Sequence, residues 1–145
     1  TARCRAVITD IDDLRALAGN ETKHGVDHPK TLVTVNNLAL LHKDMGKYNQ
    51  ALKLSQRALT NYEKNLGPDH PTTLLTINNL AFLRKDMGDN DEALELYQRV
   101  LAGNEKILGP DHPDTIATVN NMAGVHMSMR DLGKAVTYIC NIFFF

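Results

Sequence analysis

Residues 68–109 read PDHPTTLLTINNLAFLRKDMGDNDEALELYQRVLAGNEKILG, and this stretch decides the fold because the chain repeats it. The preceding stretch, residues 26–67, is identical to it at 25 of 42 positions. The Asp-His-Pro of residues 69–71 occurs at the same spacing at residues 27–29 and 111–113. A fixed period of about 20–50 residues is typical of stacked structural units, each too small to bury its own apolar face. The sequence therefore predicts a short solenoid.

The first half of each unit has a helical apolar period. Leu32, Val35 and Ala39 recur at the i, i+3, i+7 spacing of one buried face within residues 31–45. Gly46 interrupts the run, as does the glycine 42 residues later. This pattern predicts one helix, called helix A here, that ends at a tight turn.

A second periodic run follows and ends at a dense group of helix breakers. Gly67 can adopt the left-handed conformation that terminates helices. Pro71 has a fixed φ and no amide donor, so it suits the first turn of the next helix. Asp69 or His70 is placed to cap that helix. Each unit is therefore expected to be helix A, a tight turn, a longer helix B and a proline-containing loop.

Applying this plan along the chain predicts an all-α fold of about seven helices in a single array spanning residues 1–145. The expected repeats are 26–67 and 68–109, with a degenerate or truncated last repeat at 110–145. Helix A is expected at 30–45, 72–87 and 114–129, and helix B at 48–66, 90–108 and 132–143. A helix B of a partial repeat is expected at 5–24.

The third unit departs from the others at its turn and at its end. Arg130 stands where the other two units have glycine, and the chain finishes with the apolar residues 142–145. Such an apolar end normally needs a neighbour to cover it. A following repeat would provide that cover, so truncation of a longer array is expected.

Composition excludes several functional classes. The 145 residues are 43% hydrophobic and 23% charged, with a net charge of −1, which is ordinary for a globular domain. No run of Lys or Arg offers a nucleic-acid or membrane-surface patch, and no stretch of about 20 apolar residues could span a bilayer. Cys4 and Cys140 lie at opposite ends, so reduced thiols and a cytoplasmic location are expected.

The repeated positions resemble the tetratricopeptide repeat (TPR), in the 42-residue form of kinesin light chains and nephrocystin-like proteins. The resemblance covers about residues 14–139 and rests on TINNLA at 76–81, Gly88, EALELY at 92–97 and LGPDHP at 108–113. It implies a right-handed α-solenoid of stacked antiparallel helix pairs. Small residues stand where helices of a repeat must approach to about 8–10 Å, namely Ala39, Ala81 and Ala123 in helix A and Ala51, Ala93 and Ala135 in helix B. The family's aromatic late in helix A is replaced by a basic residue or histidine, at His42, Arg84 and His126.

The resemblance also implies a concave groove, lined by the A helices, that binds a peptide segment of a partner protein. Paired asparagines repeat in this groove, and each side-chain amide offers donors and an acceptor for a peptide backbone. The lysines of the groove could pair with an acidic linear motif, although Asp44 and Asp86 beside them weaken that preference. The predicted peptide-binding residues are Val33, Asn36, Asn37, Leu40, Lys43, Leu75, Asn78, Asn79, Phe82, Lys85, Asn120 and Asn121. Ala117, Gly124, Met127 and Ser128 occupy the matching positions of the third unit.

Catalytic and metal chemistry find no support in the sequence. His28, His70 and His112 each follow an aspartate, but successive copies lie about one repeat apart, too far to share one metal ion. They are expected to serve as caps and loop structure. No nucleophile with an adjacent base and no phosphate-binding glycine loop is present. An adaptor or scaffold without enzymatic activity, cofactor or metal is predicted.

The sequence is compatible with two functions. The first is a protein-interaction module that binds a linear peptide, with no nucleic-acid or membrane partner. The alternative is a structural spacer, or a repeat array that associates with itself through its apolar C-terminal end.

Overall fold

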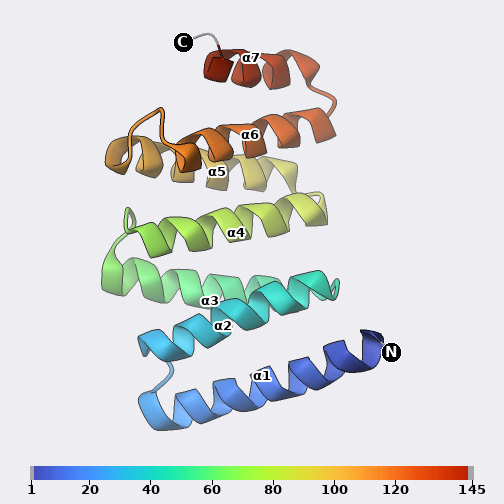
Figure 1. The fold of residues 1–145 in the computed structure, drawn as a ribbon, viewed down its shortest axis with the longest axis vertical. Helices are drawn as coiled ribbons and strands as arrows, with labels where there is room; N and C mark the ends of the chain where they lie inside the picture. Colours follow the sequence, from blue (N-terminus) through green and yellow to red (C-terminus); the bar gives the residue numbers. More distant parts are fainter. Residues whose placement is uncertain (1, 144–145) are drawn as a thin grey trace. The chain divides into compact units, whose positions relative to one another are not determined.

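The computed structural model describes the backbone of residues 2–143 and the side chains of residues 11–140, and every regular element in it is an α-helix (Figure 1). The seven helices that the sequence predicts are confirmed. Their bounds differ from the predicted ones by at most one residue, except that the first helix begins at Ala2. The helices are α1 (Ala2–His24), α2 (Pro29–Asp44), α3 (Tyr48–Leu66), α4 (Pro71–Met87), α5 (Asn90–Ile107), α6 (Pro113–Ser128) and α7 (Leu132–Phe143).

The chain divides into two compact units, and the division falls at the boundary between two sequence repeats. The N-terminal unit, Thr1–Gly67, holds α1 to α3, and the C-terminal unit, Pro68–Phe145, holds α4 to α7. Within each unit every helix packs on the helix that follows it in the chain. This arrangement is what short connections between helices of similar length favour, because antiparallel neighbours need only a few linking residues.

The repeated Asp-His-Pro motif starts each A helix in the same way. The Nδ1 atoms of His28, His70 and His112 each accept a hydrogen bond of 3.2 Å from the backbone amide two residues ahead. The proline after each histidine begins the helix, where its missing N–H costs nothing. Histidine is therefore the cap. Asp69, the other candidate, instead forms an ion pair with Lys106 at the end of α5.

Small residues bring the paired helices close together. Ala81 and Ala93, from α4 and α5, are fully buried in one apolar cluster with Tyr97. Met122 and Val125 of α6 complete this cluster, so α5 is packed between α4 and α6. The N-terminal unit has its own core, made of Leu17, Leu32, Val35, Leu38, Ala58 and Tyr62.

The turns from helix A to helix B share a left-handed residue. Gly88 ends α4 with φ 87° and ψ 3°. Arg130 stands at the matching place after α6 and has φ 59°, the only positive φ of a non-glycine residue in the described chain. The third unit thus retains the turn geometry, although it lacks the glycine that can adopt a left-handed conformation without steric strain.

The basic residues that replace the family's late aromatic contact the next turn. Arg84 pairs with Asp89 and Glu92, each at 2.9 Å. His126 is buried, stacks on Tyr138 and lies 3.9 Å from Asp131. The backbone N–H of Lys134, with that residue's ammonium, lowers the pKa of Asp131. These contacts connect the end of helix A to the start of helix B.

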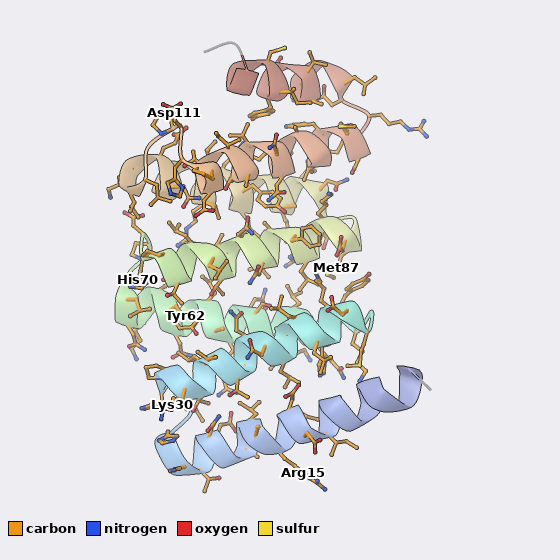
Figure 2. All side chains as sticks on the ribbon, in the orientation of Figure 1. Arg15, Lys30, Tyr62, His70, Met87 and Asp111 are labelled. Carbon is orange, nitrogen blue, oxygen red and sulfur yellow. The ribbon has the colours of Figure 1, made fainter. Side chains whose placement is uncertain are left out.

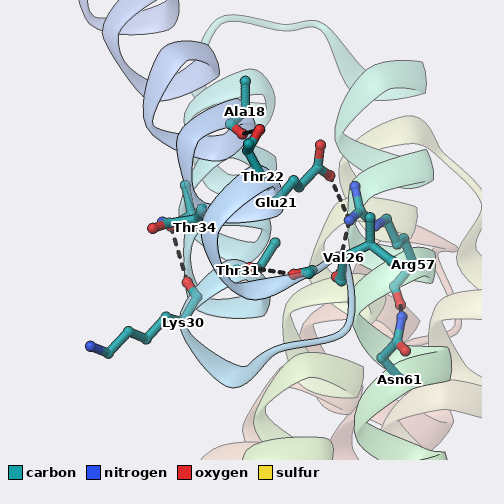
Figure 3. A network of polar contacts seen from close by, with 11 residues as sticks. Ala18, Glu21, Thr22, Val26, Lys30, Thr31, Thr34, Arg57 and Asn61 are labelled. Carbon is teal, nitrogen blue, oxygen red and sulfur yellow. Dashed lines mark hydrogen bonds and ion pairs between the residues drawn. The ribbon is translucent and has the colours of Figure 1, made fainter.

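A polar network holds the N-terminal unit together (Figure 3). Arg57 of α3 pairs with Glu21 of α1 at 2.7 Å and donates a hydrogen bond to the carbonyl of Val26. The hydroxyl of Thr31 donates to the carbonyl of Gly25 at 2.8 Å. Because Arg57 and Glu21 are each about one-third exposed, their pairing contributes no more than about 1 kcal/mol. Its main effect is to fix the α1–α2 loop against α3.

Two further observations concern the described residues. None of the helices has the length and apolar character that crossing a membrane requires. Cys140 is a free, half-buried thiol, whereas the side chain of Cys4 lies outside the described residues.

Candidate functional site

The A helices leave large apolar side chains in solvent along one face. In α2 these are Val33 and Leu40, with exposed fractions of 54% and 38%. In α4 they are Leu75 and Phe82, with 57% and 38%. Residues seven apart lie on the same helix face, two turns from each other. All four are positions that the sequence predicts to face a groove.

The C-terminal unit contains a hollow of about 290 Å³ between α4, α5 and α6. Its lining comes from the first half of α4, the last part of α5 and the first half of α6. Apolar side chains provide most of the wall, and Asp114 is the one charged residue among those described there. The lining residues are Pro71, Leu74, Leu75, Asn78, Val100, Asn104, Ile107, Leu108, Asp114, Ala117, Thr118 and Asn121.

One asparagine of each pair lines this hollow. Asn78 reaches it from α4 and Asn121 from α6, whereas Asn79 and Asn120 do not line it. The side chains of adjacent residues on a helix point about 100° apart, so one member of each pair faces the hollow and the other points away from it. In the described part of the chain, neither Asn78 nor Asn121 has a side-chain hydrogen bond. Two amides are therefore available on opposite sides of one apolar hollow.

The end of helix B supplies part of the site, which the prediction from A helices alone missed. Ile107 and Leu108 have exposed fractions of 44% and 41% beside the hollow. Asn104 also lines it and donates a hydrogen bond of 3.4 Å to Thr118. The same pair occurs 84 residues earlier, where the Asn20 amide donates to Thr34 at 2.9 Å. That repeated pairing was a signal in the sequence that helix B reaches the groove side.

Lys85 lies outside the hollow, farther along α4. Its Nζ lies 5.6 Å from the ring centroid of Phe82, which is a cation–π distance. A methyl group added at Gly124 of α6 would lie 3.6 Å from the same Nζ, so the ammonium reaches toward α6. Gly124 stands where the earlier repeats have Leu40 and Phe82. The furrow between α4 and α6 therefore has a carboxylate near one end and an ammonium toward the other.

The predicted residues of the N-terminal unit lie on the exposed side of α2. Asn37 is exposed, and Asn36 is half-buried. Lys43 is 3.8 Å from Asp44, so its charge is partly compensated by its neighbour. The side chains of both units are drawn in Figure 2. No cluster of three or more His, Cys, Asp or Glu suited to a metal ion occurs among the described residues.

Stacked antiparallel helix pairs with an exposed, amide-bearing A-helix face define a helical-repeat scaffold. A family model described as Tetratricopeptide repeat matches residues 13–64, 30–102 and 72–139. The chain therefore belongs to the tetratricopeptide repeat family, as the sequence resemblance predicts. The expected all-α solenoid class is confirmed. Repeats of this family generally serve as scaffolds for protein–protein interaction.

Solved structures with the same fold include two kinesin light chain-like proteins. A putative kinesin light chain from Podosopora anserina, with nearly identical TPR-like repeats, superposes with a TM-score of 0.85 at 22% identity, covering 97% of this chain and 67% of that one. BtubC (BKLC) from P. vanneervenii gives 0.85 at 22% identity, covering 95% of this chain and 55% of that one. The chain thus spans about half to two-thirds of their length. The comparison with curated proteins gave no match. At these identities the likeness shows the fold alone.

Proposed function

We propose that this chain is an adaptor module whose C-terminal unit binds an extended segment of a partner protein along the furrow between α4 and α6. One apolar side chain of that segment enters the hollow, and its backbone pairs with Asn78 and Asn121. The observation that carries this proposal is the placement of two amides, neither with a hydrogen-bond partner among the described residues, on either side of one apolar hollow. A side-chain amide can both donate to and accept from a peptide backbone without requiring charge.

The size of the hollow favours a peptide side chain over a complete small molecule. Its volume of about 290 Å³ is at the lower limit of small-molecule sites, which begin near 300 Å³. The hollow is also partly open to solvent, and Leu75 of α4 and Ala117 of α6 are both in its wall. One or two apolar side chains fit this space, while the rest of the segment continues along the helices.

The ammonium of Lys85 supports an acidic residue in the same segment. Lys85 is seven residues beyond Asn78, or about 10 Å along the helix axis. An extended chain rises about 3.3 Å per residue, so an acidic residue about three positions from the apolar one would reach it. Asp114 at the other end of the furrow disfavours a second carboxylate there. The ligand we propose therefore has one apolar anchor and a carboxylate on one side of it.

The test uses the absence of tryptophan from this chain. The protein is titrated into a short acidic peptide containing one Trp, and the peptide's emission is followed. A saturable blue shift is expected. The variant Asn78→Ala/Asn121→Ala should bind about 10-fold more weakly, since each lost hydrogen bond contributes about 0.5–1.5 kcal/mol. The matched variant Asn79→Ala/Asn120→Ala removes the same chemistry one residue away and should change the Kd less than about twofold.

Three results would count against the proposal. The first is no saturable shift at high micromolar protein while the helical circular dichroism is intact. The second is an equal loss of affinity in both double variants, which would show that the peptide does not bind at the hollow. The third concerns charge alone: if Lys85→Gln and a peptide with amides in place of its carboxylates bind as tightly as the originals, the acidic preference is wrong.

A further inference from the structure

Gly103 of α5 lies against Leu74, a residue in the wall of the hollow. Leu74 comes from α4, is buried, and has both of its methyl groups next to this glycine. A Cβ at position 103 would lie 2.7 and 2.8 Å from the two methyl carbons. These distances are well inside the separation of about 3.5–4.0 Å at which carbon atoms pack. Leu74 can therefore occupy its place only because residue 103 has no side chain.

The packing of helix A on helix B does not by itself require this glycine. The pair α2–α3 has the same 42-residue pattern, and Asn61 of α3 stands at the position that matches Gly103. The Asn61 amide donates a hydrogen bond of 3.1 Å to the carbonyl of Arg57 on its own helix. A helix pair of this type thus forms with a larger side chain there. Glycine in a helix interior also destabilises that helix relative to alanine, so helix formation does not favour it either.

A second copy of the same local sequence offers a direct comparison. The sequence Leu-Ala-Gly-Asn-Glu occurs at residues 17–21 of α1 and again at residues 101–105 of α5. A Cβ at Gly19 would have no atom within 4 Å, whereas a Cβ at Gly103 would clash with Leu74. Gly19 belongs to the N-terminal unit and does not line the hollow. The two glycines therefore share their sequence neighbours and differ in their contacts, which makes Gly19 a matched control.

We propose that Gly103 determines the size of the partner's side chain that the hollow accepts, because it allows Leu74 to lie against α5. A side chain at position 103 would push the Leu74 methyl groups away from α5, and the hollow is the open space beside them. With glycine at 103, the hollow has room for a bulky apolar anchor such as Leu or Phe. With alanine there, only a small anchor would fit. This inference rests on the proposed function, since it concerns the segment that binds along the furrow.

The apolar area that the anchor buries sets the size of the expected effect. A fully buried Leu or Phe side chain removes much more apolar area from water than Ala does, so a bulky anchor should bind at least about 10-fold more tightly to the unchanged chain. In Gly103→Ala, the displaced Leu74 takes up part of that space. A bulky anchor would then force neighbouring side chains off their preferred rotamers, and its advantage should fall to about twofold or less.

Fluorescence anisotropy with labelled peptides tests the proposal. The peptides share one acidic sequence and differ only at the apolar position, which is Phe, Leu or Ala. For the unchanged chain and for Gly19→Ala, the Kd of the Phe and Leu peptides should be at least about 10-fold lower than that of the Ala peptide. For Gly103→Ala the ratio should be about twofold or less. The variant Gly103→Ala/Leu74→Ala should restore the ratio of about 10-fold, because the shortened side chain at 74 leaves the hollow open.

Urea unfolding without peptide tests the contact itself. In a chain that already carries Leu74→Ala, the change Gly103→Ala should raise the urea midpoint, since alanine favours the helix and the two methyl groups are absent. In the chain that keeps Leu74, the same change should raise the midpoint less or lower it. Equal shifts in the two backgrounds would show that residues 74 and 103 are not coupled, and would overturn the inference.

The peptide measurements separate this inference from the proposed function. If the unchanged chain binds none of the peptides, the proposed function fails, and this inference fails with it. If the unchanged chain binds them but Gly103→Ala weakens all of them equally, the glycine has only a structural role, and this inference alone is overturned. It is also overturned if the unchanged chain shows no preference for a bulky anchor, if Gly19→Ala loses that preference, or if the double variant does not restore it.

Discussion

The second and third helix pairs, α4–α5 and α6–α7, have the same 42-residue repeat pattern, but equivalent side chains are buried to different extents in the two pairs. Tyr97 on α5 is fully buried, whereas Ile139, its counterpart on α7, is 37% exposed. Both side chains are large and apolar. The difference arises because Met122 and Val125 of α6 pack in one cluster with Tyr97, and no described helix does the same for Ile139 of α7. In this fold the next helix, as much as the residue itself, determines which positions form the core.

The turns between the helices of the two pairs also differ, both in the left-handed residue and in the ion pairs beside it. In the second pair, glycine takes the left-handed position and Arg84 pairs with two carboxylates. In the third pair, arginine takes the left-handed position, and His126 has one carboxylate at 3.9 Å. The third pair thus keeps the geometry with less favourable chemistry. Three predictions follow from these matched positions, beginning with the largest effect.

Truncation at the two matched apolar positions should give very different losses of stability. Tyr97→Ala removes a fully buried ring and should lower the free energy of unfolding by about 3–5 kcal/mol. Ile139→Ala removes a partly exposed side chain and should lower it by less than about 1 kcal/mol. Urea unfolding followed by circular dichroism measures both losses. Similar losses would show that α7 is covered as fully as α5.

Alkaline pH should destabilise the second pair through the same tyrosine. Burial raises the pKa of Tyr97 to about 12, with the charge of Asp86 acting in the same direction. In the unfolded chain tyrosine ionises near pH 10. The stability that the neutral ring contributes is therefore fully present below about pH 10 and is lost as the pH rises toward 12. At about 1.4 kcal/mol per pKa unit, the loss is about 3 kcal/mol.

Tyr97→Phe isolates this contribution. The Tyr97 hydroxyl is buried and has no hydrogen-bond partner among the described residues, so its removal should leave stability at pH 7 unchanged or slightly higher. Between pH 10 and 12 the variant should lose about 3 kcal/mol less than the unchanged chain. Tyr62, whose pKa is also raised by burial, is present in both proteins, so its effect cancels in the difference. Parallel pH profiles would contradict the prediction.

The sequence allowed much of the fold to be predicted and only part of the site. The period located the helices, since apolar spacing and proline positions are local signals. The choice between Asn78 and Asn79 is not local. It depends on the rotation of α4 relative to α6 and on where the end of α5 lies. The contribution of Ile107 to the hollow was missed for the same reason. Likewise, Arg130 revealed a missing glycine but not that the backbone keeps the left-handed turn.

The smallest expected effect on stability comes from exchanging the residue types at the left-handed position of these two turns. Gly88→Ala places a Cβ in a left-handed position and should lower the free energy of unfolding by about 1–2 kcal/mol. No atom lies within 4 Å of that Cβ, so the loss is one of backbone strain alone. Arg130→Gly relieves the same strain after α6. It also increases the freedom of the unfolded chain, which offsets about 0.4–1 kcal/mol of the gain.

Arg130→Gly should therefore stabilise the protein by about 0.5–1 kcal/mol. Arg130→Ala is the control, because it removes the arginine side chain but keeps the strained φ. It should leave the urea midpoint nearly unchanged, since the side chain of Arg130 is exposed. If Arg130→Ala stabilised the protein as much as Arg130→Gly, the gain would come from losing the side chain. If only the glycine variant is more stable, the two turns share one geometry, and the residue at 130 strains the turn of the third pair.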